Sequence, residues 1–278
     1  MRLAVGCAMF THPAWQDWQP GREKLRAYAQ RCTAVEGNTT FYAVPSVKTT
    51  AAWAAQTPED FRFAVKIHRT VTHDKRLTGV ETEMREFLAA VEPLGSRVHP
   101  LWVQLPPSFG PSELAVLGSF LRRLPRDYPK AVEVRHPAFF ENPRAAAALV
   151  ATLDSAGAEW LTFDTTVLFE AAPGSAAERE ASAKKPRVPR LVTALTDHPV
   201  VRYHGRDAPE PTIAGWQPWI ATVVEWLREG RSPTVFLHTP DNASSLDLAR
   251  RFHEAVRAEV PELDPLPEPA GTEPFTLF

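Results

Sequence analysis

Eight short apolar runs recur along the chain, each with the length and the aliphatic or β-branched character of a buried strand. They begin near Leu3, Ala34, Arg62, Pro100, Ala131, Glu159, Val200 and Thr234. Between them lie segments with apolar residues at helical spacing, as in 114–124, 216–227 and 248–256. Because strands and helices alternate at intervals of about 30 to 40 residues, the pattern predicts an α/β fold, a single domain over residues 1–278 closed as a TIM-like (β/α)8 barrel.

Two segments depart from this repeat. The connection after the sixth strand, residues 170–198, is long and contains the basic, proline-rich stretch 184–189. We expect it to be irregular and to emerge on the C-terminal face of the barrel, either as a lid over a site or as a solvated excursion. The tail 261–278 is rich in Pro and Glu and predicts an extended segment pinned by Phe275 and Phe278.

Side chains alternate between the two faces of a strand, so each predicted strand divides into two sets. One set is aliphatic, aromatic or small and is expected to face the helices: Val35, Gly37, Val65, Ile67, Val103, Leu105, Val132, Val134, Leu161, Phe163, Val201, Tyr203, Val235 and Leu237. The other set is expected to face the barrel interior: Glu36, Asn38, Lys66, His68, Gln104, Glu133, Arg135, Thr162, Asp164, Arg202, His204, Phe236 and His238.

Most of the inward set is ionisable or carries an amide, whereas barrel interiors are normally filled by bulky apolar side chains. Because burying an unpaired charge is costly, polar groups at the C-terminal ends of these strands predict a ligand site. The alternative is a structural ion-pair network, which would add little stability because desolvation offsets the Coulomb attraction. Its members would be Glu36, Lys66, Glu133, Arg135, Asp164 and Arg202.

Composition narrows the classes of partner. The 31 Lys and Arg residues nearly balance the 33 Asp and Glu residues, so the charge pattern does not favour nucleic acid or an anionic membrane as a partner. Cys7 and Cys32 are too few for a disulfide framework and lack metal-type spacing, which favours a reducing, cytoplasmic location. No phosphate-binding glycine loop, nucleophile elbow or zinc-protease motif occurs. We therefore expect a cytoplasmic protein with a small anionic molecule as its partner, in an oligomeric state that the sequence does not determine.

Several motifs occur together in one known family. They are Glu36-Gly-Asn-Thr-Thr-Phe-Tyr42, Thr57-Pro-Glu-Asp-Phe-Arg-Phe63, Gln104-Leu-Pro-Pro107, Glu133-Val-Arg-His-Pro137 and the final strand followed by Asp241-Asn242. Over essentially the whole chain the sequence resembles the YecE-like family, known as domain of unknown function 72. It departs from the commoner family opening of Gly-Thr-Ser-Gly-Trp type, having Gly6-Cys-Ala-Met-Phe instead. The resemblance implies a TIM-like barrel in a bacterial cytosolic protein, with a site at these strand ends, and it implies no particular reaction.

Our first hypothesis is a metal-independent enzyme, without a favoured cofactor, that acts on a small molecule bearing a phosphate or carboxylate. Arg135 and Arg202 would hold the anion through planar, multi-donor hydrogen bonds. Lys66 and Glu133 would be the proton-transfer pair, because burial moves the pKa values of both toward neutrality; Lys66 could instead form a Schiff base with a carbonyl substrate. The other candidates are Glu36 and Asp164 as catalytic carboxylates, and Asn38, Gln104, His136, His204, His238 and Asn242 as substrate-binding residues.

Two further hypotheses stay open. A divalent-metal hydrolase or isomerase, in a phosphodiesterase or nuclease version, would use ligands that suit hard or borderline cations. These ligands would be Glu36, Glu133, Asp164, His204 and His238. The cationic side chains of the same layer, Lys66, Arg135 and Arg202, argue against this metal hypothesis, because they raise the cost of binding a divalent ion. The other hypothesis is a non-catalytic receptor for a small molecule or partner, with Trp15, Trp18, Phe41 and Tyr42 near the barrel mouth to stack on the ligand.

Overall fold

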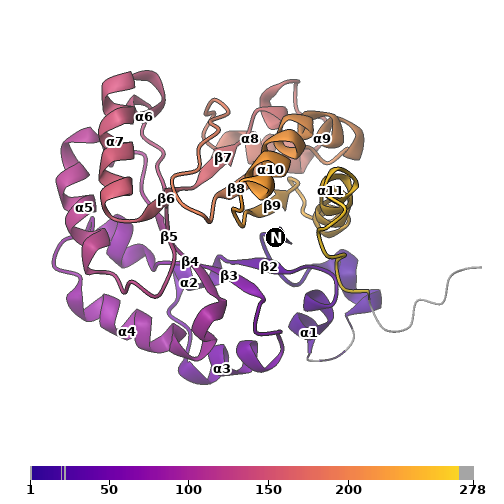
Figure 1. Ribbon diagram of the computed structural model, residues 1–278, viewed down its shortest axis with the longest axis horizontal. Coiled ribbons are helices and arrows are strands. Elements are labelled where there is room, and N and C mark those ends of the chain that lie inside the picture. The colour runs from indigo at the N-terminus through magenta and orange to yellow at the C-terminus, as the bar shows by residue number, and fades with distance from the viewer. Residues whose placement is uncertain (1, 20, 22, 269–278) are drawn as a thin grey trace, which may run out of the picture.

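The computed structural model describes residues 2–19, 21 and 23–268 and shows a ring of helices around a central cylinder of parallel strands (Figure 1). The strands are β1 (Ala4–Cys7), β2 (Ala34–Gly37), β3 (Arg62–Lys66), β4 (Val98–Gln104), β5 (Lys130–Glu133), β6 (Ala158–Trp160), β7 (Thr162–Asp164), β8 (Val200–His204) and β9 (Thr234–His238). They lie side by side in the order β6-β5-β4-β3-β2-β1-β9-β8-β7. Each of the eight predicted strand starts lies within two residues of an observed one.

Closure of the cylinder occurs at the sixth strand. β6 and β7 are two halves of this strand, separated only by Leu161. Because β6 pairs with β5 while β7 pairs with β8, the sheet is joined through this segment into a nearly closed barrel. The predicted single-domain (β/α)8 barrel is therefore confirmed.

Most of the helices form the outer layer of the barrel (Figure 1). The helices are α1 (Lys24–Ala29), α2 (Thr39–Tyr42), α3 (Val47–Ala55), α4 (Glu81–Val91), α5 (Leu114–Arg123), α6 (Ala138–Glu141), α7 (Pro143–Ser155), α8 (Ala176–Lys184), α9 (Pro209–Gly215), α10 (Gln217–Arg228) and α11 (Ser245–Glu259). The helices α5, α10 and α11 coincide with the apolar stripes of the sequence, which they turn toward the strands. In the described part of the chain, no helix combines the length and the apolar character that crossing a membrane requires.

The N-terminal half of the barrel interior is filled by one apolar layer. Its members are Ala4, Ala34, Ala64, Trp102, Ala131, Leu161, Val200 and Phe236. The small alanine side chains leave room inside the cylinder for the rings of Trp102 and Phe236. Two residues further along the strands, the same face carries Glu36, Lys66, Gln104, Glu133, Phe163, Arg202 and His238. Because strand side chains repeat with a period of two, this mostly polar layer lies directly above the apolar one.

The sixth strand has the opposite orientation to the one predicted. Leu161 belongs to the interior layer, and Phe163 lies next to it on the inward face. Thr162 and Asp164 face the helices instead, where the Asp164 carboxylate accepts a hydrogen bond from Trp219 Nε1 of α10 at 2.6 Å. The prediction was wrong because both faces of this strand carry polar and apolar side chains, and only the packed helix layer shows which face offers partners to a carboxylate.

The connection 170–198 was predicted to be irregular throughout. This was wrong for its first part, which contains α8. The Ser175 hydroxyl caps this helix by accepting a hydrogen bond from the Glu178 amide at 2.9 Å. An ion pair of 2.6 Å between Glu178 and Arg206 fastens α8 to the loop after β8. The remainder of the connection, after Lys184, has no regular structure, as expected.

The described part of the C-terminal tail, residues 261–268, was predicted to be extended, but it begins with a turn at 261–263 and continues without regular structure along α11. Leu263 and Leu266 are buried, and Arg250 of α11 forms an ion pair of 3.0 Å with Glu268. The predicted anchors Phe275 and Phe278 lie outside the described residues.

Candidate functional site

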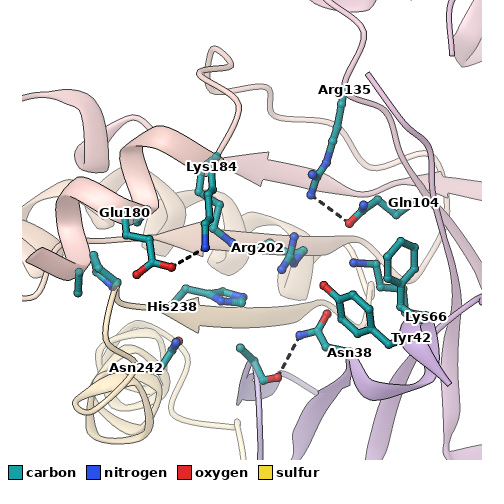
Figure 2. A pocket seen from close by; sticks show the side chains of 16 residues that line it. Asn38, Tyr42, Lys66, Gln104, Arg135, Glu180, Lys184, Arg202, His238 and Asn242 are labelled. Atoms are coloured by element: carbon teal, nitrogen blue, oxygen red, sulfur yellow. Dashed lines mark hydrogen bonds and ion pairs between the residues drawn. The ribbon is translucent and has the colours of Figure 1, made fainter. Parts of the chain in front are cut away.

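The polar layer opens into a pocket of about 400 Å³ at the C-terminal ends of the strands (Figure 2). This volume lies within the usual range of small-molecule sites. Figure 2 shows Lys66, Arg135, Gln104 and Tyr42 on one side of the pocket and Glu180 and Lys184 of α8 on the other. Seven of the predicted site residues line this one cavity: Asn38, Lys66, Gln104, Arg135, Arg202, His238 and Asn242.

Arg202 of β8 is the centre of a buried ion-pair network at the base of the pocket. Its Nε and Nη2 donate to the two carboxylate oxygens of Glu36 at 2.6 and 3.0 Å. Its Nη1 donates to Glu133 Oε2 at 3.0 Å. The other oxygen of Glu133 accepts a hydrogen bond from Arg135 Nε at 2.7 Å. All four carboxylate oxygens therefore have a guanidinium donor, so the structural network that the sequence suggested exists for these residues.

One imidazole side chain and one amide side chain also donate hydrogen bonds to Glu36. His238 Nε2 donates to Glu36 Oε1 at 2.7 Å, and Asn38 Nδ2 donates to Glu36 Oε2 at 2.8 Å. The same Asn38 nitrogen donates to the Ala8 carbonyl at 3.0 Å. This arrangement fixes the loop after β2 and the end of β9 relative to each other on the two sides of β1.

The donors keep both glutamates ionised. Burial by itself would raise the pKa of Glu36, but Arg202 and His238 lower it well below its usual range. Burial likewise opposes ionisation of Glu133, and Arg135 and Arg202 prevail and lower its pKa to about 2. The expectation that burial would move the Glu133 pKa toward neutrality was wrong, because the sequence did not reveal how close the two guanidinium groups lie. Glu133 is therefore a fixed negative charge near neutral pH.

Lys66 and Lys185 stand apart from this network. No carboxylate of the described residues lies within 4 Å of either ammonium group. Burial lowers the pKa of Lys66 to about 7, with Arg202 and Arg135 adding to the effect against the attraction of Glu133. Burial also lowers the pKa of Lys185 to about 8. Amines with these pKa values can gain and lose protons near neutral pH.

Trp102 lies in the apolar layer directly beneath the pocket residues Lys66 and Arg202. Its ring centroid lies 4.6 Å from Lys66 Nζ and 4.5 Å from the Arg202 guanidinium carbon. The ring of Phe41 lies on Lys66 as well, 4.4 Å from Nζ. The aromatic faces attract both cations while keeping water away from them. This explains why a strand-end lysine is desolvated although a pocket lies next to it.

Helix α8 supplies pocket residues that the sequence reading did not assign to the site. Ala177, Glu180, Ala181 and Lys184 of α8 line the cavity, together with Lys185, which directly follows the helix. Lys184 is paired with Glu180 at 2.5 Å, whereas Lys185 extends the positive lining. The available signal was the pair of adjacent lysines in the long connection after the sixth strand, which must emerge on the active face of a barrel.

The aromatic residues expected at the barrel mouth divide into two groups. Phe41 and Tyr42 line the pocket, and Tyr42, at the edge of the pocket, is 72% exposed. Trp15 is buried instead, and its indole nitrogen donates to the Ala243 carbonyl at 2.8 Å. Trp18 packs against Trp15 and under Arg31. These two tryptophans therefore pack loops and do not line the pocket.

His204 lies beside the pocket and not in its main wall. It lines a small annex of about 50 Å³ together with His238, on whose ring it stacks with centroids 4.1 Å apart. Burial, with the nearby His238, lowers the pKa of His204 well below its usual value. His204 Nε2 is buried without a hydrogen-bond partner among the described residues. A neutral imidazole at this position can accept a hydrogen bond from a ligand that enters the annex.

The predicted site residues Asp164 and His136 do not reach the pocket, and neither does His68, which was predicted to face the barrel interior. Asp164 faces α10, as described above. The His136 ring packs beside Gly110, and its Nδ1 accepts a hydrogen bond from the Ala138 amide at 3.1 Å, because the chain turns away from the barrel at Pro137. His68 lies past the end of β3, with its Nε2 3.3 Å from the Tyr42 carbonyl oxygen.

The ligand set of the metal hypothesis is not assembled. Asp164 is on the opposite face of its strand from Glu36 and Glu133, and the oxygens of those two glutamates are occupied by guanidinium donors. Across residues 2–19, 21 and 23–268, no group of three or more His, Cys, Asp and Glu side chains has an arrangement suited to a metal ion.

Asp164→Asn is expected to lower the free energy of unfolding by about 1.5–3 kcal/mol, because it weakens charge-assisted hydrogen bonds. The affected donors are Arg190 Nε at 2.9 Å and Trp219 Nε1 at 2.6 Å. Urea unfolding measures the loss, and an unchanged free energy of unfolding would contradict the assignment of Asp164 to the helix layer.

The fold and the pocket define the class of protein: a single-domain (β/α)8 barrel with a charged cavity where barrel enzymes have their active sites. The chain belongs to the DUF72 family, since the family model described as "Protein of unknown function DUF72" matches residues 4–272. It is 35% identical over 265 residues to UPF0759 protein YecE of Escherichia coli (strain K12). The alignment covers 95% of this chain and 96% of that protein. UPF0759 protein YunF of Bacillus subtilis (strain 168) is 26% identical over 129 residues, or 44% of this chain and 46% of YunF.

Two solved structures of DUF72 family proteins share the fold. The Enterococcus faecalis V583 protein superimposes with a TM-score of 0.63 at 19% identity, covering 91% of this chain and 98% of that one. The Thermotoga maritima MSB8 protein also gives 0.63, at 21% identity, covering 94% of this chain and 100% of that one. At these identities the likeness supports the barrel architecture and carries no information on a reaction.

Proposed function

We propose that this protein is a metal-independent enzyme that binds a small molecule bearing a phosphate or a carboxylate and uses Lys66 for proton transfer. The observation that carries the proposal is the excess of positive charge in the pocket. The cationic groups are Arg135, Arg202, Lys66 and Lys185, against the two carboxylates of Glu36 and Glu133. With both lysines protonated, about two positive charges are left for a ligand to neutralise.

A phosphate monoester suits this excess well. It carries about −1.5 to −2 charge near pH 7 and several acceptor oxygens. Arg135 is held by Glu133 and by Gln104 Oε1, which accepts from its Nη2 at 3.0 Å. Its guanidinium group is therefore oriented before a ligand arrives, which lowers the entropy cost of binding. The same excess positive charge disfavours a divalent cation, and this supports chemistry without a metal.

The division of labour in the pocket follows from the pKa values. Glu36 and Glu133 stay ionised and orient the two arginines, whereas Lys66 exchanges protons near neutral pH. Lys66 is thus the acid-base group of the proposal, and Glu133 positions its neighbours and transfers no proton itself. His238 is held by Glu36 at the edge of the same cavity and is available for substrate contact.

Inorganic phosphate should raise the melting temperature of the protein. At a concentration about one hundred times the Kd, a ligand adds about 2.7 kcal/mol, which corresponds to roughly 5–10 °C for a chain of this size. The measurement is a thermal scan at pH 7 with potassium chloride at matched ionic strength, repeated with acetate and malonate for the carboxylate class. Lys185→Met and Arg135→Met should each lower the shift by more than half. Lys48→Met, on the exposed surface of α3, serves as the matched control.

Anions that stabilise the protein then define a panel of phosphorylated and carboxylated compounds for turnover assays by mass spectrometry. Conversion by the unsubstituted protein, and its loss in Lys66→Met, supports the enzyme. A compound that binds and is never converted favours the receptor hypothesis instead. If neither phosphate nor any carboxylate shifts the melting temperature beyond the chloride control, the proposed anion site is wrong.

A further inference from the structure

We infer that Lys66 forms an imine with its substrate, and that the pocket takes an aldehyde or ketone that also carries a phosphate or carboxylate. This inference rests on the proposed function, because the anionic group of the ligand is what would hold the carbonyl beside Lys66. It assigns to Lys66 covalent chemistry in addition to proton transfer.

The position of Lys66 is that of a rigid, desolvated amine. It is the last residue of β3, and its side chain is 7% exposed. Its Nζ lies over the rings of Phe41 and Trp102 at 4.4 and 4.6 Å and makes no hydrogen bond with the described residues. Buried lysines are usually paired with a carboxylate. An amine with aromatic neighbours in place of an acceptor is free to react when it loses its proton.

Two neighbouring cations favour the unprotonated form. Burial is the largest cause, and together with the repulsion of Arg202 and Arg135 it outweighs the attraction of Glu133, so that the pKa of Lys66 falls to about 7. At pH 7 about half of such an amine is free, against about one in 2,500 for an ordinary lysine with a pKa near 10.4. Desolvation combined with a neighbouring cation is a known way of activating a lysine nucleophile.

The reaction balances without any further reactant. The lone pair of Lys66 Nζ attacks the carbonyl carbon, and a C–N bond forms. The carbonyl oxygen then leaves as water together with both hydrogens of the amine, and a C=N bond remains. Gln104 lines the pocket, and its Oε1 accepts a hydrogen bond from Arg135. Its amide nitrogen makes no hydrogen bond with the described residues. This amide can donate to the oxygen while negative charge develops on it.

Lys185 is the competing amine in the same cavity. It follows α8 on an irregular segment and is only partly buried, whereas Lys66 is held by a barrel strand. Reacting groups gain most from a fixed geometry. The imine is therefore assigned to Lys66, and Lys185 is assigned to the anionic group of the ligand.

Pyridoxal 5′-phosphate, which carries both an aldehyde and a phosphate, is a suitable probe, with glyoxylate as a smaller aldehyde bearing a carboxylate. After reduction with borohydride, peptide mass spectrometry of the full-length protein should find the label on Lys66, formed at least tenfold faster than on the exposed Lys48. The labelling rate should rise with pH through a midpoint near 7 and not near 10.4. Pyridoxal, which lacks the phosphate, should label Lys66 at least tenfold more slowly.

Lys66→Arg keeps the positive charge and removes the reactive amine, so it should abolish pocket labelling, whereas Lys48→Arg, on the exposed surface of α3, should retain it. Circular dichroism and the melting temperature establish that both variants are folded. Labelling of Lys185 in preference to Lys66, or no Lys66 adduct with either probe, would overturn the imine assignment. Phosphate stabilisation measured on the same samples separates the two proposals, because it can persist when no imine forms and fails only if the anion site is wrong.

Discussion

Arg202→Met is expected to lower the free energy of unfolding by about 3–5 kcal/mol, because it leaves two buried carboxylates without their shared partner. Arg202 makes three hydrogen bonds to Glu36 and Glu133, and its side chain is 4% exposed. Methionine fills a similar volume but cannot compensate either charge. Urea unfolding at pH 7 measures the difference.

The loss should depend on pH in a direction that identifies its cause. In the unsubstituted protein the pKa of Glu36 and that of Glu133 lie below their unfolded values, so both stabilise the fold at neutral pH and lose this effect as pH falls through the folded values. Without Arg202, burial prevails, and we expect these carboxyl groups to bind protons more tightly in the folded state than in the unfolded state. The deficit should therefore be largest near pH 7 and become smaller toward pH 4.

Arg135→Met is the matched control for this experiment. The Arg135 side chain is 19% exposed, and its removal leaves Glu133 still bound to Arg202. We expect a loss of about 1–2 kcal/mol, in line with one charge-assisted hydrogen bond. A deficit below about 1 kcal/mol for Arg202→Met, or one that does not change with pH, would mean that the network does not hold the two charges as its geometry indicates.

Trp102→Ala should have an effect of similar size on stability, about 3–5 kcal/mol, because it opens a large cavity in the barrel interior. Trp102 is fully buried, in the apolar layer immediately beneath the charged one. Its ring also excludes water from Lys66 and Arg202. The variant should therefore change the chemistry of the pocket together with the stability of the fold.

The second expected result for Trp102→Ala is a rise in the pKa of Lys66. Water that enters the cavity would solvate the ammonium group, and the midpoint of Lys66 labelling should move upward by at least about one pH unit. Trp102→Phe retains an aromatic face and should keep the midpoint close to 7. If Trp102→Ala destabilises the protein and the midpoint stays in place, the Trp102 ring is not what lowers the pKa of Lys66.

The period-two repeat of strands couples the stability of the barrel to its site. Ala64 and Lys66, Trp102 and Gln104, or Val200 and Arg202 are neighbours on one face, so each strand contributes first to the apolar layer and then to the charged one. A substitution in the apolar layer therefore changes the support directly beneath a site residue. This is why Trp102→Ala reports both on folding and on the chemistry of the pocket.

What the sequence determined by itself is the barrel and most of its polar layer. Hydrophobic runs and helical stripes are local patterns, and alternation along a strand needs no knowledge of distant residues. For this reason the eight strand starts and the inward orientation of Glu36, Lys66, Gln104, Glu133, Arg202 and His238 were predicted correctly. The family was also recognisable from its motifs.

Only the tertiary structure decided the orientation of Asp164, the contribution of α8 and the ionisation of Glu133. Asp164 faces outward because Trp219 and Arg190, distant in sequence, offer it hydrogen bonds there. Glu133 is ionised because two guanidinium groups, one from β8 and one from the segment after β5, converge on it. Electrostatic interactions between buried groups depend on separations of a few ångströms, and those separations arise only when the barrel closes.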